Sequence, residues 1–230
     1  LICKSLSKNS IWINIFPDDP WNFNLGNISN KNVLKCMNFY DYYCLWSKKI
    51  IKRMKSLKLG KKTIYLPFAY DPLIHKGQKV NKFIYDINFI GTFDKIREKI
   101  ILNIQKYKLI VAGSNWPLTK KFKKINVVLG NKYSNIIAKS RVSLNILRAQ
   151  NITSHNMKTF EIPAMNGLLL TRRSKEQNIF FPEKFIQSDT KSSVAFGLTV
   201  AGKKIENFPI LTPIRLNSCL DFLSNNFISS

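Results

Sequence analysis

The sequence has 230 residues, 45% of them apolar, and 37 Lys and Arg against 13 Asp and Glu give a formal net charge of +24. This composition is typical of a globular protein and excludes a disordered chain. No apolar run approaches the roughly 20 residues of a membrane-spanning helix, and the opening LICKSLSKNS does not resemble a signal peptide. We therefore expect a cytoplasmic location, and we interpret the start at Leu1 as that of a fragment or a trimmed product.

The cysteines do not predict a metal centre. Their spacing contains no C-x-x-C pair, and no histidine cluster lies near them in the sequence, which disfavours both a zinc site and a disulfide framework. The four are Cys3, Cys36, Cys44 and Cys219.

The positive charge raises nucleic acid or an anionic membrane as a partner. Lysine outnumbers arginine about fourfold and accompanies abundant Asn and Ile, a mixture that an AT-rich coding sequence produces by itself. The basic residues are also spread along the chain, with short clusters only at KKIIKRMKSLKLGKK and TKKFKK. Nucleic acid is therefore disfavoured, and the charge predicts a solvated basic surface that attracts phosphates, with peripheral membrane contact left open.

The first third of the chain predicts three strands and a helix. An apolar run at 11–16 before the turn sequence PDDP predicts a buried strand, and strands are also expected at 40–46 and 63–68. Between them, residues 48–59 predict a helix that ends at Gly60. Its buried face should carry Ile50, Ile51, Met54 and Leu57, with the lysines on the solvated face.

A second series follows the polar linker at 71–82. Strands are expected at 85–91, 108–113, 126–130, 141–147 and 167–171, and helices at 94–107, 133–140 and 156–166. Alternating strands and helices predict an α/β fold with two Rossmann-like units, whose parallel sheets are covered on both faces. We expect domains at 1–80 and 81–184, followed by a divergent tail of uncertain order at 185–230.

In such sheets ligands bind beyond the carboxyl ends of the strands. That rule selects two loops of the second unit, one with Gly91 and Thr92 and one with Gly113. It also selects the approach to the helix at 156–166, with His155 and Asn156. In the first unit it selects Asp18 and Asp19, which could line the acceptor side of a cleft, although turn chemistry alone also explains PDDP. Taken alone, each glycine motif is weak and is better explained as a simple turn.

Several segments in order resemble the CgeB-like (spore maturation protein type) glycosyltransferases, a group-1-like branch of the GT-B fold. These are INIFPDDPWNF, YLPFAYDP, FIGTFDKIREKII, RVSLNILR and NMKTFEIPAMNGLLLTRRSKEQ, within residues 11–184. The resemblance implies a first domain truncated at its N-terminus. It also implies transfer of a sugar from a nucleotide-diphosphate donor, held mainly by the second unit without a bound metal. The acceptor is unknown, and a cell-surface or spore polysaccharide or glycoconjugate would fit the family.

The resemblance also implies roles for individual residues. Glu161 matches the second glutamate of the family's paired motif and would accept hydrogen bonds from the donor ribose, whereas the first glutamate is replaced by Thr153. Lys158 stands where arginine is usual and would lie near the diphosphate, at the N-terminus of the 156–166 helix. Arg97 would face either the phosphates or solvent.

Alternatives stay open at this stage. Glu161 could be an exposed helix residue, and His155 could be a helix-start residue rather than a base or a donor contact. The chain could be a nucleotide-sugar-binding module without catalysis, which the absent carboxylate at Thr153 favours. It could also be a basic protein that binds nucleic acid or an anionic membrane.

Overall fold

A computed structural model describes residues 9–21, 30–148, 151, 153–172, 174–181, 186–187 and 198–199. The chain forms two compact units. The first comprises Leu1–Phe68, Leu147–Asn156 and Ser174–Glu176, and the second comprises Ala69–Ile146, Met157–Arg173 and Gln177–Ser230. The sequence suggested a division after residue 80, whereas the structure groups the chain from Ala69 onward with the second unit.

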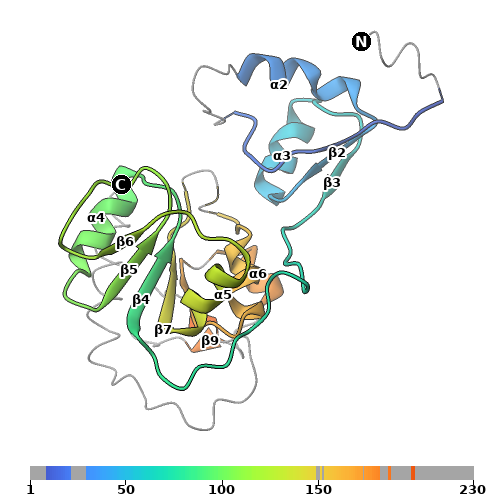
Figure 1. Cartoon of the computed structure of the whole chain (residues 1–230). Coiled ribbons are helices and arrows are strands. Elements are labelled where there is room, and N and C mark those ends of the chain that lie inside the picture. Colours follow the sequence, from blue (N-terminus) through green and yellow to red (C-terminus); the bar gives the residue numbers. More distant parts are fainter. Residues whose placement is uncertain are drawn as a thin grey trace. The chain divides into compact units, whose positions relative to one another are not determined.

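The first unit contains a three-stranded parallel sheet in the order β1-β2-β3 (Figure 1). The strands are β1 (Ile13–Ile15), β2 (Tyr42–Leu45) and β3 (Thr63–Tyr65), and the helices are α2 (Asn30–Cys36), the 3-10 turn η1 (Met37–Phe39) and α3 (Lys48–Ser56). All three expected strands are present, each shorter than its apolar run. The predicted parallel pairing is confirmed.

One face of this sheet carries the core of the first unit. Ile50, Ile51 and Met54 of α3 are buried together with Tyr43 and Leu45 of β2. The predicted burial of Leu57 is wrong, because α3 ends at Ser56 and the Leu57 side chain, at the helix C-cap, is 52% exposed.

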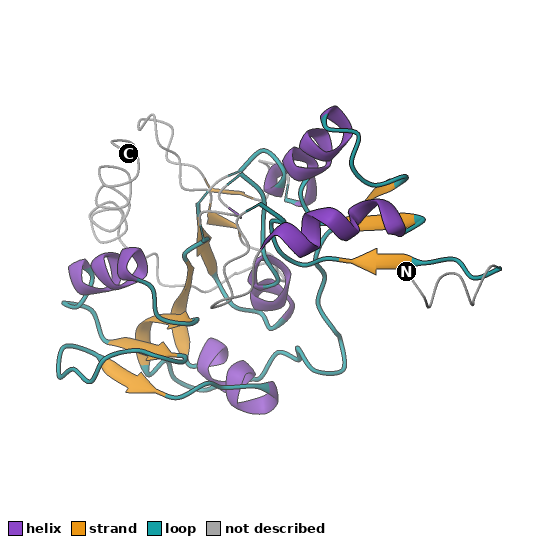
Figure 2. Ribbon diagram, turned by 90° about the horizontal axis from the view of Figure 1, so that it is seen from above, coloured by secondary structure: helices purple, strands orange, loops and turns teal. Residues whose placement is uncertain are grey.

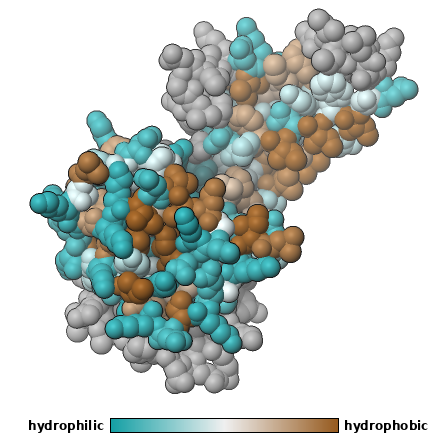
Figure 3. Space-filling model, viewed as in Figure 1, coloured by the Kyte–Doolittle hydropathy of each residue, from teal (hydrophilic) through white to brown (hydrophobic). Residues whose placement is uncertain are grey.

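The other face of the sheet is apolar and open within the part of the chain that the structure describes. Ile15 pairs with Cys44 and Cys44 with Ile64, so these side chains share one face, as does that of Ile13. Ile13 and Ile15 are 57% and 68% exposed, and Figure 3 shows hydrophobic side chains gathered over the strands of this unit. The expectation of a buried first strand, in a sheet covered on both faces, is therefore wrong here.

The second unit contains a seven-stranded sheet in the order β6-β5-β4-β7-β8-β10-β9. Its parallel strands are β4 (Tyr85–Ile90), β5 (Leu109–Ala112), β6 (Lys123–Ile125), β7 (Ser140–Asn145) and β8 (Leu169–Thr171). Two short strands, β9 (Ile186–Gln187) and β10 (Leu198–Thr199), pair antiparallel with each other, and β10 pairs antiparallel with β8. The predicted tail at 185–230 lies outside the described residues apart from these two strands.

Helices lie on both faces of the second sheet (Figure 2). Helix α4 (Lys95–Asn103) buries Ile100 and Ile101 in one core, while α5 (Gly130–Ala138) and α6 (Lys158–Ala164) pack on the other side through Ile137 and Ile162. A four-residue helix, α7 (Gln177–Phe180), follows β8. The predicted α/β fold with two parallel sheets is confirmed.

One predicted strand of the second unit is displaced. The apolar segment at 126–130 was expected to form a strand, but β6 precedes it, and residues 126–129 form the loop that leads into α5. Val127 and Leu129 are exposed there. Among the described residues, no helix has the length and apolar character needed to cross a membrane.

A buried carboxylate connects three segments of the first unit. Oε1 of Glu176 accepts hydrogen bonds from the Lys48 backbone N–H at 3.0 Å and the Ser47 hydroxyl at 3.3 Å, both at the start of α3. Oε2 accepts from the Ser154 hydroxyl at 2.9 Å and the Tyr65 hydroxyl at 3.4 Å. A charged acceptor at a helix N-terminus is stabilising, and a buried one requires such partners. Glu176 therefore fixes α3, β3 and the segment around Ser154 to one another.

We expect Glu176→Gln to lower the free energy of unfolding by about 2–3 kcal/mol, because a neutral amide replaces a charged acceptor and its NH2 group faces other donors. Chemical denaturation with a spectroscopic readout measures this change. Lys52→Gln is the matched control, since Lys52 lies on the exposed face of α3 and should change stability by less than about 0.5 kcal/mol. Equal stabilities of the two variants would contradict the assignment.

Candidate functional site

Two glycine loops at the carboxyl edge of the second sheet pack backbone against backbone. Gly113, after β5, has a φ of +152°, and a Cβ atom there would collide with the carbonyl of Gly91, which follows β4. The Gly91 N–H donates to the Ala112 carbonyl at 2.8 Å. Gly113 is thus explained by this close approach, and the two loops lie side by side at the edge where such sheets bind ligands.

Side chains hold these loops together. The Trp116 indole N–H donates to the Gly91 carbonyl at 2.8 Å, and the Ser114 hydroxyl donates to the Thr92 hydroxyl at 3.3 Å. The Phe93 N–H donates to the Ser114 carbonyl at 2.9 Å. The two loops that were predicted to contact the donor are therefore fixed to each other. We call residues 91–93 and 113–116 together the ledge.

Arg97 lies beneath this ledge, in the first turn of α4. Its Nη1 donates to the Thr92 carbonyl at 3.0 Å and its Nη2 to the Ile146 carbonyl at 2.9 Å, and the side chain is buried. The solvent-facing alternative is therefore wrong. The structure gives Arg97 a positioning role, since it connects the loop after β4 to the end of β7. Its contact with donor phosphates stays a prediction.

Glu161 of α6 is part of a three-residue cluster. The Tyr133 hydroxyl on α5 donates to its Oε2 at 3.0 Å, and Nε2 of His75 lies 3.5 Å from its Oε1. The Glu161 side chain is only 13% exposed, so the alternative of an exposed helix residue is wrong. Burial, and then the nearby Glu161 charge, raise the pKa of Tyr133 well above its ordinary value, so the phenol stays a hydrogen-bond donor.

His75 is held in place by its own loop. Its Nδ1 lies 3.0 Å from the Asp71 N–H, and the Asp71 carboxylate accepts from the Leu73 N–H at 2.8 Å. If Nδ1 accepts the Asp71 proton, the ring proton is on Nε2, facing Glu161. Sequence reasoning missed this residue because it lies in the segment interpreted as a linker, although it is one of only two histidines in the chain.

The end of α6 explains the small residues that follow Glu161. Asn166 has a φ of +60°, its N–H donates to the Pro163 carbonyl, and the Gly167 N–H donates to the Ile162 carbonyl, which together make a Schellman motif. A Cβ atom on Gly167 would collide with Ile137. The glycine therefore lets α6 and the step into β8 pack closely on α5.

The N-terminus of α6 differs from the predicted helix at 156–166. The helix begins at Lys158, and Met157 in front of it makes no side-chain capping bond. Lys158 belongs to the second unit, whereas His155 and Asn156 belong to the first. Each of these three predicted donor contacts stays a prediction.

His155 has a structural environment in the first unit. Its ring is fully buried, Nε2 accepts from the Phe68 N–H at 3.2 Å, and Nδ1 lies 3.0 Å from the Ser154 hydroxyl. Since that hydroxyl donates to Glu176, the network places the ring proton on Nδ1. Burial lowers the pKa of His155 to about 4, so the ring is neutral near pH 7. A contact with a donor would have to replace one of these bonds.

The two aspartates of the PDDP turn also lie in the first unit. The Asp19 carboxylate is buried and accepts from the Trp21 N–H at 2.9 Å, as in an Asx turn. Asp18 is partly exposed. The turn explains Asp19, and an acceptor-side role of either residue stays a prediction. Among the described residues, no cluster of three or more His, Cys, Asp or Glu side chains could hold a metal ion, and metal independence likewise stays a prediction.

Part of the chain matches a known family. Residues 93–194, from the loop after β4 through α6 and β8, match a family model described as glycosyl transferase-like. A search of curated proteins finds no match for the sequence.

Several solved structures are similar to this chain at low sequence identity. They include a DNA-modifying β-glucosyltransferase solved with and without its substrate uridine diphosphoglucose (16% identity, 71% of this chain, 61% of that one, TM-score 0.46). Another is the T4 phage β-glucosyltransferase (14% identity, 72% of this chain, 56% of that one, TM-score 0.44). A third is a glycosyltransferase involved in avilamycin A biosynthesis (9% identity, 68% of this chain, 62% of that one, TM-score 0.41). The chain thus spans between 56% and 62% of the length of these three structures.

The buried neutral His155 predicts a pH dependence of stability. In the unfolded chain the ring takes up a proton near pH 6.5, whereas in the folded protein it stays neutral until about pH 4. The unfolded state therefore binds more protons in this window, and the free energy of unfolding should fall as the pH falls from 6.5 to 4, by up to about 1.4 kcal/mol per unit.

The test compares denaturation curves at several pH values for the wild type, His155→Gln and His75→Gln. His155→Gln should lose this part of the slope, and His75→Gln, the control at the other histidine, should keep it. The same slope in the wild type and His155→Gln would show that His155 is not responsible.

Proposed function

We propose that this chain belongs to a glycosyltransferase that moves a sugar from a nucleotide-diphosphate donor to an acceptor, without a bound metal, and that the second unit binds the donor. The observation that carries the proposal is the match of residues 93–194 to a glycosyl transferase-like family. That segment contains Glu161, Lys158 and the loop with Gly113, three of the predicted donor contacts.

The surroundings of Glu161 support its role as the ribose acceptor. A carboxylate has about four lone-pair sites. Tyr133 occupies one and His75 lies close enough to occupy a second, which leaves capacity for two ribose hydroxyls. Because Tyr133 already fixes the carboxylate, little side-chain entropy would be lost on binding. A charged, preoriented acceptor is suited to vicinal hydroxyl groups.

Transfer requires stabilisation of the departing diphosphate. Negative charge builds on its oxygens as the sugar–phosphate bond breaks, so fixed positive charge and backbone N–H groups accelerate the reaction. We assign this role to Lys158 at the start of α6 and to the ledge formed by the loops with Gly91, Thr92 and Gly113. The rigidity of that ledge supports the assignment, since preorganised donors need no rearrangement when the charge develops.

A donor-binding module without transfer is the second candidate. Thr153 stands at the position of the family's first glutamate, so one carboxylate of the expected pair is missing. Binding of a nucleotide sugar with neither hydrolysis nor transfer to any acceptor tested would favour this candidate.

The first experiment is a melting-temperature screen of nucleotide sugars, starting with uridine diphosphoglucose. If none of them raises the melting temperature, the proposed donor binding is wrong.

We expect Glu161→Gln to weaken binding of the donor found in that screen by roughly tenfold to a hundredfold. The substitution keeps the shape of the side chain but replaces a charged acceptor, whose hydrogen bonds contribute about 1.5–3 kcal/mol. Calorimetric titration measures the affinity. Glu98→Gln on α4 is the matched control, being the same chemical change outside the predicted donor site, and should bind the donor like the wild type.

Melting curves of both variants complete this test. A loss of stability in Glu161→Gln without a specific loss of affinity would assign Glu161 a structural role with Tyr133 and His75. Equal donor affinities of Glu161→Gln and the wild type would remove Glu161 from the site.

A further inference from the structure

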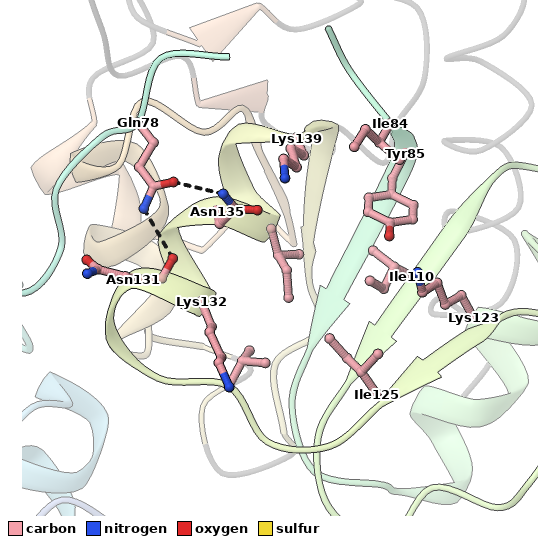
Figure 4. Close-up of a pocket in the computed structure, with 12 residues that line it drawn as sticks. Gln78, Ile84, Tyr85, Ile110, Lys123, Ile125, Asn131, Lys132, Asn135 and Lys139 are labelled. Carbon is pink, nitrogen blue, oxygen red and sulfur yellow. Dashed lines mark hydrogen bonds between the residues drawn. The ribbon is translucent and has the colours of Figure 1, made fainter. Parts of the chain in front are cut away.

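A hollow of about 600 Å³ lies in the second unit, along α5. Figure 4 shows α5 on one side of it and the strands β4, β5 and β6 on the other. Its floor is apolar, formed by Ile110 and Ile125 of the sheet, Val128 of the following loop and Ile136 of α5. None of the residues predicted to bind the donor lines it.

The rim of the hollow is basic. Lys123 at the start of β6, Lys132 on α5 and Lys139 just after α5 all line it, and no aspartate or glutamate among the described residues does so. The Lys123 ammonium lies 5.7 Å from the centre of the Tyr85 ring, which also lines the hollow. Three cations around an apolar floor, with no carboxylate of the hollow to neutralise them, attract an anion.

One wall of the hollow is fixed by hydrogen bonds. The Gln78 amide donates to the Asn131 carbonyl at 3.1 Å and accepts from the Asn135 amide at 3.1 Å (Figure 4). These contacts hold the loop before β4 against α5. The hollow is therefore a formed feature of the second unit, and its shape does not depend on a bound ligand.

We propose that this hollow binds an anionic amphiphile, a molecule with an apolar body and a phosphate monoester or carboxylate group. The apolar body would lie on the isoleucine floor, where burial removes its surface from water. The anionic group would lie among the ammonium groups of Lys123, Lys132 and Lys139, which are attached by flexible side chains and can close on it. The proposal is independent of the donor site, because it uses other residues.

Decyl phosphate is the probe, titrated below its micelle concentration, with inorganic phosphate and decanol as its two halves. We expect decyl phosphate to bind at least tenfold more tightly than either half.

The double variant Lys132→Gln/Lys139→Gln should lose about tenfold to a hundredfold in affinity for decyl phosphate. The matched control Lys52→Gln/Lys55→Gln removes the same charge from α3 and should bind like the wild type. Ile84→Gln, at the partly exposed apolar end of the hollow, should also weaken binding, with melting curves verifying that each variant folds.

Four outcomes would overturn the proposal. Equal affinity losses in the two double variants would show unspecific attraction to a basic protein, and inorganic phosphate binding as tightly as decyl phosphate would show that the floor is not used. Binding to phosphatidylcholine vesicles that contain phosphatidic acid, with no binding of soluble decyl phosphate, would assign these lysines to a membrane surface. Competition between decyl phosphate and the donor nucleotide sugar would show that the two molecules bind at the same site.

Discussion

The buried Glu176 carboxylate is the constraint on which the first unit depends. It accepts hydrogen bonds from the start of α3, from β3 and from Ser154, a residue 22 positions earlier in the sequence. An ionised group without such partners would be costly to bury. The same requirement explains why two short segments, Leu147–Asn156 and Ser174–Glu176, belong to the first unit, although the chain between them belongs to the second. The segment with helix α6 and strand β8 is therefore preceded and followed in the sequence by residues of the first unit.

Backbone carbonyls also need hydrogen-bond partners, and this requirement shapes the carboxyl edge of the second sheet. The Gly91 carbonyl accepts from Trp116 and the Thr92 carbonyl accepts from Arg97. Because buried side chains satisfy these carbonyls, the loops after β4 and β5 hold their conformation without a ligand. Such an edge can present N–H groups in fixed directions. The proposed reaction would use such fixed N–H groups, because charge would develop on a leaving diphosphate.

The local sequence pattern predicted strands and helices better than it predicted which distant residues contact one another. Apolar runs at 85–91 and 108–113 gave β4 and β5 to within a residue or two, because a strand buried on both faces needs a continuous run. The run at 126–130 failed as a strand prediction, since Val127 and Leu129 are exposed in a loop. Periodicity indicates which face of a helix is buried, but not what meets it. The bond from Tyr133 to Glu161 spans 28 residues, and the one from Ser47 to Glu176 spans 129. The resemblance singled out Glu161, whereas neither His75 nor Tyr133 carried any such pattern.

The net charge of +24 gives the chain a strong excess of basic side chains. Several of the few carboxylates accept hydrogen bonds from the protein itself, among them Asp19, Asp94, Glu161 and Glu176. Most lysines in the described part of the chain, by contrast, are exposed. Such a field concentrates anions near the surface but does not discriminate among them. For the proposed function, selection of a nucleotide sugar would therefore have to come from groups that a simple phosphate cannot satisfy. The fixed Glu161 carboxylate would be one such group under this proposal, because a carboxylate repels a bare phosphate and can accept hydrogen bonds from ribose hydroxyls.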